Sequence, residues 1–178
     1  GTEGSKGRKL FCLSGAVAKP GIYEVEFGIT LRQLIELGGG MRSGSTMQAI
    51  LLGGAAGGFV GPNDLDLPLT MEATRAAGSS LGSGVVMVLD QSVDMVDQLR
   101  RIAAFFRDES CGQCVPCRVG TVRQEEIVSR LAKGVQSQDI ELLRELGTVM
   151  RDASICGLGQ TANSAIDSAI NKLKVFAV

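Results

Sequence analysis

The stretch ESCGQCVPCRVGT, residues 109–121, carries three cysteines that are each separated by two residues, Cys111, Cys114 and Cys117, and a fourth, Cys156, follows much later in the chain. Two-residue gaps let three thiolates converge on different iron corners of a cubane, while a remote cysteine closes the remaining corner. The pattern therefore predicts a 4Fe–4S cluster. It also requires two distant parts of the second half of the chain to meet at one place.

Zinc is the competing ligand for four thiolates. Structural zinc sites more often use two separated pairs of ligands, so the three-plus-one distribution favours iron and sulfide, although a four-cysteine zinc site stays open as an alternative. The chain contains no histidine. This excludes Cys/His zinc sites and Ser-His catalytic triads.

Three further side chains near or outside the motif have expected roles. Arg118 and Arg151 are candidates for raising the reduction potential of the cluster, because nearby cations stabilise its more negative reduced form. Cys12 lies between Phe11 and Leu13 in a predicted strand. Since a lone free cysteine is usually a small buried hydrophobe, Cys12 is expected to be an inert core thiol.

Around the cysteines, the second half of the chain has the apolar periodicity of helices. Helices are predicted over 93–106, around 127–135, from Ser137, which can cap its helix, to Met150, and over 162–173. Residues 90–178 are therefore expected to form a four-helix-bundle iron–sulfur domain.

The first half is richer in glycine and predicts mainly strands. Lys9–Ser14 and Gly21–Phe27 are joined by a Pro-Gly pair, which favours a hairpin. Thr30 stands three residues before Gln33, the spacing of a capping box, so a short helix should follow.

Two apolar runs complete the first domain. Met47–Leu52 and Val85–Leu89 predict buried strands, with a short helix between them over 70–77. The glycine-rich stretch Leu52–Gly61 lacks the Lys-Ser/Thr of a P-loop and is expected to be a structural turn. The order strand, strand, helix, strand, strand predicts an α+β class with a small β-grasp (ubiquitin-like) domain over residues 1–89.

Composition excludes several classes of protein. The 178 residues are 44% hydrophobic and 21% charged, which is ordinary for a folded globular protein. The net charge is −1 and the basic residues are spread along the chain, so nucleic acid is not an expected partner. Apolar runs are far shorter than a membrane-spanning helix requires, and the first residues do not form a secretory signal.

The motif ESCGQCVPCRVGT with the later SICGLG, residues 154–159, resembles the C-terminal cluster-binding domain of the NADH-oxidising flavoprotein subunit of respiratory complex I. Diaphorase subunits of NAD-dependent formate dehydrogenases and NAD-reducing hydrogenases share this module. Upstream, SGAVAKPGIYEV, LLGGAAGGF and AGSSLGSGVVMVLD resemble the soluble-ligand-binding β-grasp domain of the same family. The resemblance covers nearly the whole chain and assigns Cys111, Cys114, Cys117 and Cys156 as the cluster ligands.

The resemblance implies part of an oxidoreductase that takes hydride from NADH onto FMN and passes electrons singly to the cluster, or runs in reverse. It implies that the backbone after the fourth ligand, at Gly157 and Leu158, approaches the flavin. The family's FMN- and NADH-binding domain precedes the β-grasp domain, and its glycine-rich flavin motif is absent here. The chain alone is thus expected to hold the cluster but not to bind FMN or NAD(H).

The implied partners are an N-terminal FMN/NADH-binding domain of the same subunit, a thioredoxin-like 2Fe–2S subunit and a larger iron–sulfur subunit. The implied location is the cytoplasm, or the cytoplasmic or matrix face of a membrane complex. Quinone-, formate- and hydrogen-linked parent complexes all remain open. The alternative function is a non-redox β-grasp interaction module with a structural four-cysteine zinc site.

Overall fold

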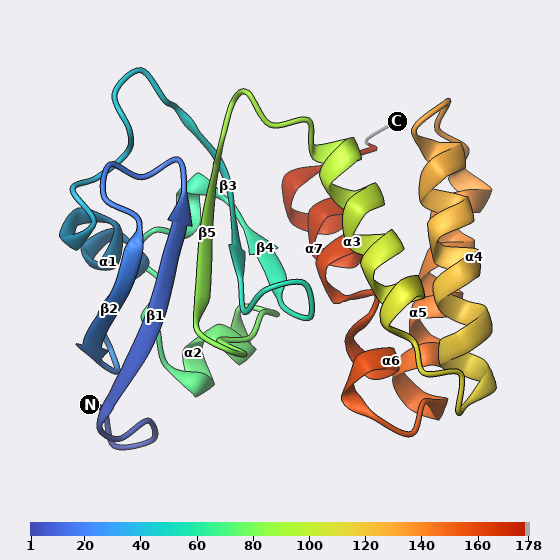
Figure 1. The fold of residues 1–178 in the computed structure, drawn as a ribbon, viewed down its shortest axis with the longest axis horizontal. Coiled ribbons are helices and arrows are strands. Elements are labelled where there is room, and N and C mark those ends of the chain that lie inside the picture. The colour runs from blue at the N-terminus through green and yellow to red at the C-terminus, as the bar shows by residue number, and fades with distance from the viewer. Residues whose placement is uncertain (177–178) are drawn as a thin grey trace. The chain divides into compact units, whose positions relative to one another are not determined.

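In the computed structural model, which describes residues 1–176, the first two strands form the predicted hairpin (Figure 1). Strand β1 (Arg8–Gly15) pairs antiparallel with β2 (Gly21–Glu26). Side chains alternate between the two faces of a strand, and in β1 this buries Phe11 and Leu13 but leaves Cys12 exposed. The prediction of a buried Cys12 is therefore wrong.

The remaining strands extend the hairpin into one mixed sheet. Strand β5 (Val85–Asp90) pairs parallel with β1 and antiparallel with β3 (Met47–Leu52), which in turn pairs with β4 (Gly58–Val60). The strand order is β2-β1-β5-β3-β4. The first and last strands are thus parallel neighbours at the centre, which is the β-grasp arrangement that the sequence predicts.

Helix α1 (Leu31–Leu37) begins with the predicted capping box. The Thr30 hydroxyl accepts a hydrogen bond from the Gln33 N–H at 3.2 Å, and the Gln33 side chain accepts one from the Thr30 N–H at 3.0 Å. The helix buries Leu31, Leu34 and Ile35 in the hydrophobic core of the first half of the chain. The core also contains Phe11, Leu13, Val17, Val25, Ile50, Leu52, Val60, Leu69, Leu81, Val86 and Val88.

The glycine-rich stretch is more ordered than the predicted turn, because its end forms β4. Phe59 and Val60 in that strand are fully buried. A Cβ atom on Gly57 would collide with the carbonyl oxygen of Leu52, so the chain can turn back on β3 only with glycine there. A short 3-10 turn (Pro62–Asp64) and the predicted helix α2 (Met71–Ala76) follow.

Asp90, at the end of β5, is a buried carboxylate held by three side chains. It accepts hydrogen bonds from Ser92 Oγ at 2.6 Å, from Ser45 Oγ at 2.7 Å and from Arg42 Nη2 at 3.1 Å, and it is 3% exposed. These bonds, those from Ser92 first, hold the pKa of Asp90 well below its ordinary value.

A pKa that is lower in the folded than in the unfolded state contributes stability above the unfolded value, near 3.8, and this contribution is lost as the pH falls below it. Asp90→Asn should therefore lower the free energy of unfolding at pH 7 and make stability less dependent on pH between about 5 and about 2. Urea denaturation across this range measures both effects. Replacement of the exposed Glu36 by Gln is the control, and an equal loss in both variants would contradict the prediction.

Contacts divide the chain into two compact units, Gly1–Val93 and Asp94–Val178. The boundary expected after residue 89 lies one residue before the end of β5. The Asp94 side chain caps α3 (Met95–Glu109) by accepting hydrogen bonds from the Val96 and Asp97 N–H groups at 2.9 and 3.1 Å.

The second unit is helical, as predicted, but its helices differ from the expected ranges. Helix α4 (Val115–Leu131) begins well before the predicted 127. Helix α5 (Ser137–Ala153) has Gln136 at its N-cap without a side-chain hydrogen bond, so Ser137 is the first helical residue and not its cap. A short helix, α6 (Gly157–Thr161), precedes α7 (Ser164–Leu173).

Packing among these helices joins the two distant cysteine segments. Helix α4 contacts α3, α5 and α6, and α3 also contacts α7. The fully buried Gln124 of α4 donates from Nε2 to the carbonyl oxygen of Ala162, between α6 and α7, at 3.0 Å. None of the helices formed by the described residues has the length and apolar character needed to cross a membrane.

Candidate metal centre

All four predicted ligands line one cavity of about 370 Å³ in the helical unit. Cys111 lies in the loop after α3, Cys114 is the N-cap residue of α4, and Cys117 is in the first turn of that helix. Cys156 is the N-cap residue of α6. The cavity is also lined by Glu109, Gly112, Gln113, Ile155 and Leu158.

The start of α4 favours the thiolate form of Cys114. Pro116 in the first turn needs no backbone N–H partner there, which suits a helix start. Hydrogen bonds from the backbone N–H groups of Ile155 and Cys117 hold the pKa of Cys114 below its ordinary value. N–H groups at a helix N-terminus stabilise negative charge. These N–H groups therefore favour the thiolate form of Cys114, which is the form that binds a metal.

The loop between the first two ligands requires glycine. Gly112 has a φ of +80°, and a Cβ atom there would lie 2.6 Å from Nη2 of Arg118. The exposed guanidinium of Arg118 therefore lies against the backbone between Cys111 and Cys114. Arg151 instead pairs with Asp152, with Nε and Oδ1 2.8 Å apart, which offsets its charge. Arg118 remains the better candidate for tuning the potential.

Two buried hydroxyl groups at the site were not singled out by the sequence analysis. Ser110 Oγ is 3.3 Å from Cys117 Sγ. Ser154 Oγ is buried and makes no hydrogen bond in the structure. Each serine is 5% exposed. Their places in the sequence, one residue before Cys111 and two before Cys156, were the available signal.

The donor set and the cavity fit a 4Fe–4S cluster. Among residues 1–176, no three His, Cys, Asp or Glu side chains come close enough together to hold a single metal ion. The four thiols are arranged instead around a shared cavity. A cubane binds each thiolate through a different iron atom, whereas zinc requires four sulfurs about 2.3 Å from one ion.

Gly157 and Leu158, whose backbone is expected to approach the flavin, have different surroundings. Leu158 lines the cysteine cavity. Gly157 is the first residue of α6, and a Cβ atom built on it would have no neighbour within 4 Å. The backbone at Gly157 therefore has open space beside it.

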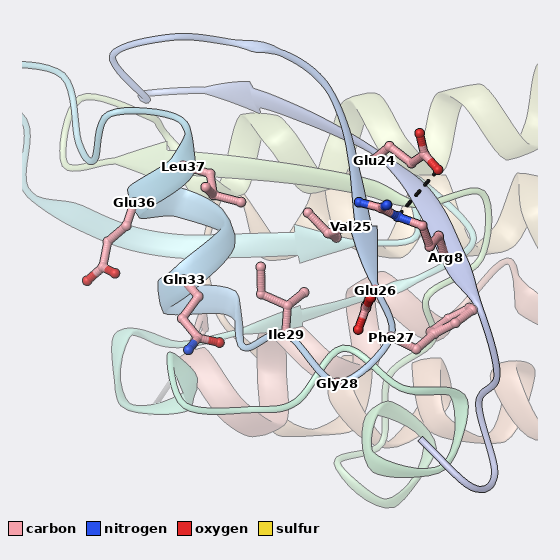
Figure 2. A pocket seen from close by; sticks show the side chains of 10 residues that line it. All are labelled: Arg8, Glu24, Val25, Glu26, Phe27, Gly28, Ile29, Gln33, Glu36 and Leu37. Carbon is pink, nitrogen blue, oxygen red and sulfur yellow. Dashed lines mark ion pairs between the residues drawn. The ribbon is translucent and has the colours of Figure 1, made fainter. Parts of the chain in front are cut away.

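A larger hollow lies on the first unit, beside β2 and α1. Its volume is about 930 Å³, and Figure 2 shows Val25 and Ile29 between the α1 side chains and Arg8. Arg8 Nε and Glu24 Oε1 form an exposed ion pair at 3.4 Å. The hollow is lined by Arg8, Glu24, Val25, Glu26, Phe27, Gly28, Ile29, Gln33, Glu36 and Leu37. None of these residues was assigned a ligand-binding role by the sequence analysis.

A β-grasp unit followed by a helical unit with four cysteines around one cavity defines an iron–sulfur protein. Residues 97–175 match the family model of the NADH-ubiquinone oxidoreductase-F iron–sulfur binding region, and residues 10–60 match the SLBB domain. The chain belongs to the family that joins these two domains, as the sequence motifs predicted. Its cofactor is a 4Fe–4S cluster.

Curated relatives agree with this family. The chain is 39% identical over 173 residues to the NADP-reducing hydrogenase subunit HndC of Solidesulfovibrio fructosivorans, covering 96% of this chain and 35% of the relative. It is 38% identical over 175 residues to the NADH-quinone oxidoreductase F subunit of Mycobacterium tuberculosis, covering 98% of this chain and 39% of the relative. The chain thus spans well under half the length of these relatives.

A solved structure has the same fold. The crystal structure of an NAD+-reducing [NiFe]-hydrogenase in the H2-reduced state matches with a TM-score of 0.86 and 35% sequence identity. The match covers 99% of this chain and 30% of the hydrogenase chain. The β-grasp and helical folds are therefore those of a segment found within a larger oxidoreductase subunit.

Proposed function

We propose that this chain is the electron-relay portion of an NAD(H)-linked, FMN-containing oxidoreductase subunit, and that Cys111, Cys114, Cys117 and Cys156 hold its 4Fe–4S cluster. The observation that carries the proposal is the convergence of four thiols from two distant segments on one cavity. The family match over residues 97–175 supports it independently.

The bound cluster would accept and release one electron at a time. The chain's own contribution is to hold the cluster and to control its surroundings. The thiolates fix its position, while backbone N–H groups at the start of α4 offset negative charge. Apolar side chains of Ile155 and Leu158 line the same cavity.

The remaining parts of the proposal concern the parent protein. Residues 90–178 form the cluster domain, and residues 1–89 act as a β-grasp scaffold. FMN and NAD(H) would bind a separate N-terminal domain of the subunit, with Gly157 and Leu158 facing the flavin; the open space at Gly157 is suited to close approach by a planar ring. A thioredoxin-like 2Fe–2S subunit and a larger iron–sulfur subunit would continue the relay, in the cytoplasm or at a cytoplasmic or matrix membrane face.

Metal analysis of the anaerobically purified chain tests the proposal. We expect about four iron and four sulfide per chain, broad visible absorption, and a low-temperature EPR signal after reduction with dithionite. We also expect no bound flavin and no NADH-ferricyanide activity. A colourless protein with one zinc per chain would instead support the structural zinc alternative.

A further inference from the structure

Ser110 places a buried hydroxyl beside one of the proposed ligands. Ser110 is the C-cap residue of α3 and has an extended backbone, so the chain leaves the helix there and continues into Cys111. Its Oγ is 3.3 Å from Cys117 Sγ. Between a serine and a neutral thiol either atom can donate, but an iron-bound thiolate has no proton and can only accept. In the cluster-bound protein, the Ser110 hydroxyl must be the donor.

Two hydrogen bonds hold the backbone of Ser154, one through its N–H group and one through its carbonyl oxygen. Its N–H donates to the Met150 carbonyl oxygen at 3.1 Å, and its own carbonyl oxygen accepts from Gln160 Nε2 at 2.9 Å. A Cβ atom built on Gly159 would lie 2.6 Å from Ser154 Cβ and 2.8 Å from Cys117 Cβ. The Ser154 side chain is therefore packed next to the cysteine site, where it cannot turn away easily.

The Ser154 hydroxyl nevertheless has no hydrogen-bond partner in the structure. A buried hydroxyl without a partner is unfavourable, and such a group in a protein calls for an explanation such as a bound ion, a water molecule or a functional role. The missing partner of the Ser154 hydroxyl is thus best supplied by a sulfur atom of the bound cluster.

We infer that Ser110 and Ser154 donate O–H···S hydrogen bonds to the cluster sulfurs, Ser110 to the Cys117 thiolate and Ser154 to a sulfur of the bound cluster beside it, and that both bonds raise the reduction potential. The inference rests on the proposed function and adds to it two positioning residues that set the cluster's energy. Reduction makes the cluster more negative, so a donor to sulfur stabilises the reduced form more than the oxidised form. Burial strengthens this effect because water competes less for the sulfur.

Potentiometric titration followed by EPR tests this inference with Ser110→Ala and Ser154→Ala. At the wild-type midpoint potential, we expect the ratio of reduced to oxidised cluster to fall roughly fivefold in each variant, as expected for the loss of one charge-assisted hydrogen bond. Ser168→Ala is the matched control, because Ser168 is also buried but lies in α7, where its hydroxyl donates to the Ala165 carbonyl oxygen of the same helix. Serine variants that keep iron and the wild-type potential would overturn the inference but not the cluster assignment.

Resonance Raman spectroscopy of the wild-type chain keeps the inference open to refutation if an alanine variant loses its cluster. Bands of the Fe–S(Cys) stretch should shift between H2O and D2O when exchangeable O–H groups bind the sulfurs. Ser110→Thr and Ser154→Thr, which retain the hydroxyl, should keep the wild-type shift. Bands that stay unchanged in D2O would overturn the inference. A wild-type chain without iron and sulfide would instead refute the proposed function.

Discussion

Cys156→Ala is expected to remove the cluster from the protein. This cysteine is the sole proposed ligand from the α5–α6 segment, and its loss leaves one iron corner without a thiolate. Since even outer-sphere substitutions weaken metal sites by about 10–100-fold, we expect iron and sulfide per chain to fall at least about tenfold. Metal analysis and low-temperature EPR of the dithionite-reduced protein measure the loss.

Cys12→Ala is the matched control for this prediction. It also removes one exposed cysteine, but from strand β1 of the first unit, far from the motif in sequence and outside the cavity lining. Iron, sulfide and the EPR spectrum should stay at wild-type levels. If Cys156→Ala behaved like Cys12→Ala, the four-thiolate site would have to be abandoned.

The ligand set could be proposed from sequence because it depends on spacing, whereas the start of α4 could not. Periodicity analysis recognises a helix by a stripe of apolar residues. The buried face of α4 begins instead with Cys117, Gly120, Thr121 and Gln124, of which the last two are fully buried polar residues. Thr121 bonds to the Cys117 carbonyl oxygen within its own helix, and Gln124 bonds to Ala162 across to another segment. A hydropathy pattern does not reveal that a polar residue is buried when a distant hydrogen-bond partner is what makes its burial possible.

Local rules succeeded where neighbouring residues alone decide the structure. The capping box at Thr30 and Gln33 needs no distant contact, and the hairpin needs only a turn between two apolar segments. The exposure of Cys12 depended on which face of the sheet its strand buries, and the sequence around it is apolar on both faces. The role of the serines beside the cysteines likewise depends on how α4, α5 and α6 pack together.

Gly159→Ala is expected to damage the site through packing alone. The added methyl would collide with Ser154 Oγ and lie 2.8 Å from Cys117 Cβ, and both of these side chains are buried. Overpacking of this kind costs about 1–3 kcal/mol and forces neighbours to move. We therefore expect a lower free energy of unfolding for the apoprotein, measured by urea denaturation, and fewer iron atoms per chain, because the displaced neighbours include a ligand.

Gly157→Ala, two residues earlier in the same helix, is the contrasting substitution. A Cβ atom at Gly157 meets nothing within 4 Å, and neither glycine has a positive φ, so alanine fits there without strain. Because alanine loses less backbone entropy on folding, the apoprotein should be unchanged or up to about 1 kcal/mol more stable, with full iron content. The two substitutions add the same methyl to the same short helix, and only Gly159→Ala is expected to lower the free energy of unfolding. Equal effects on stability would mean that contact with Ser154 and Cys117 does not make glycine necessary at 159.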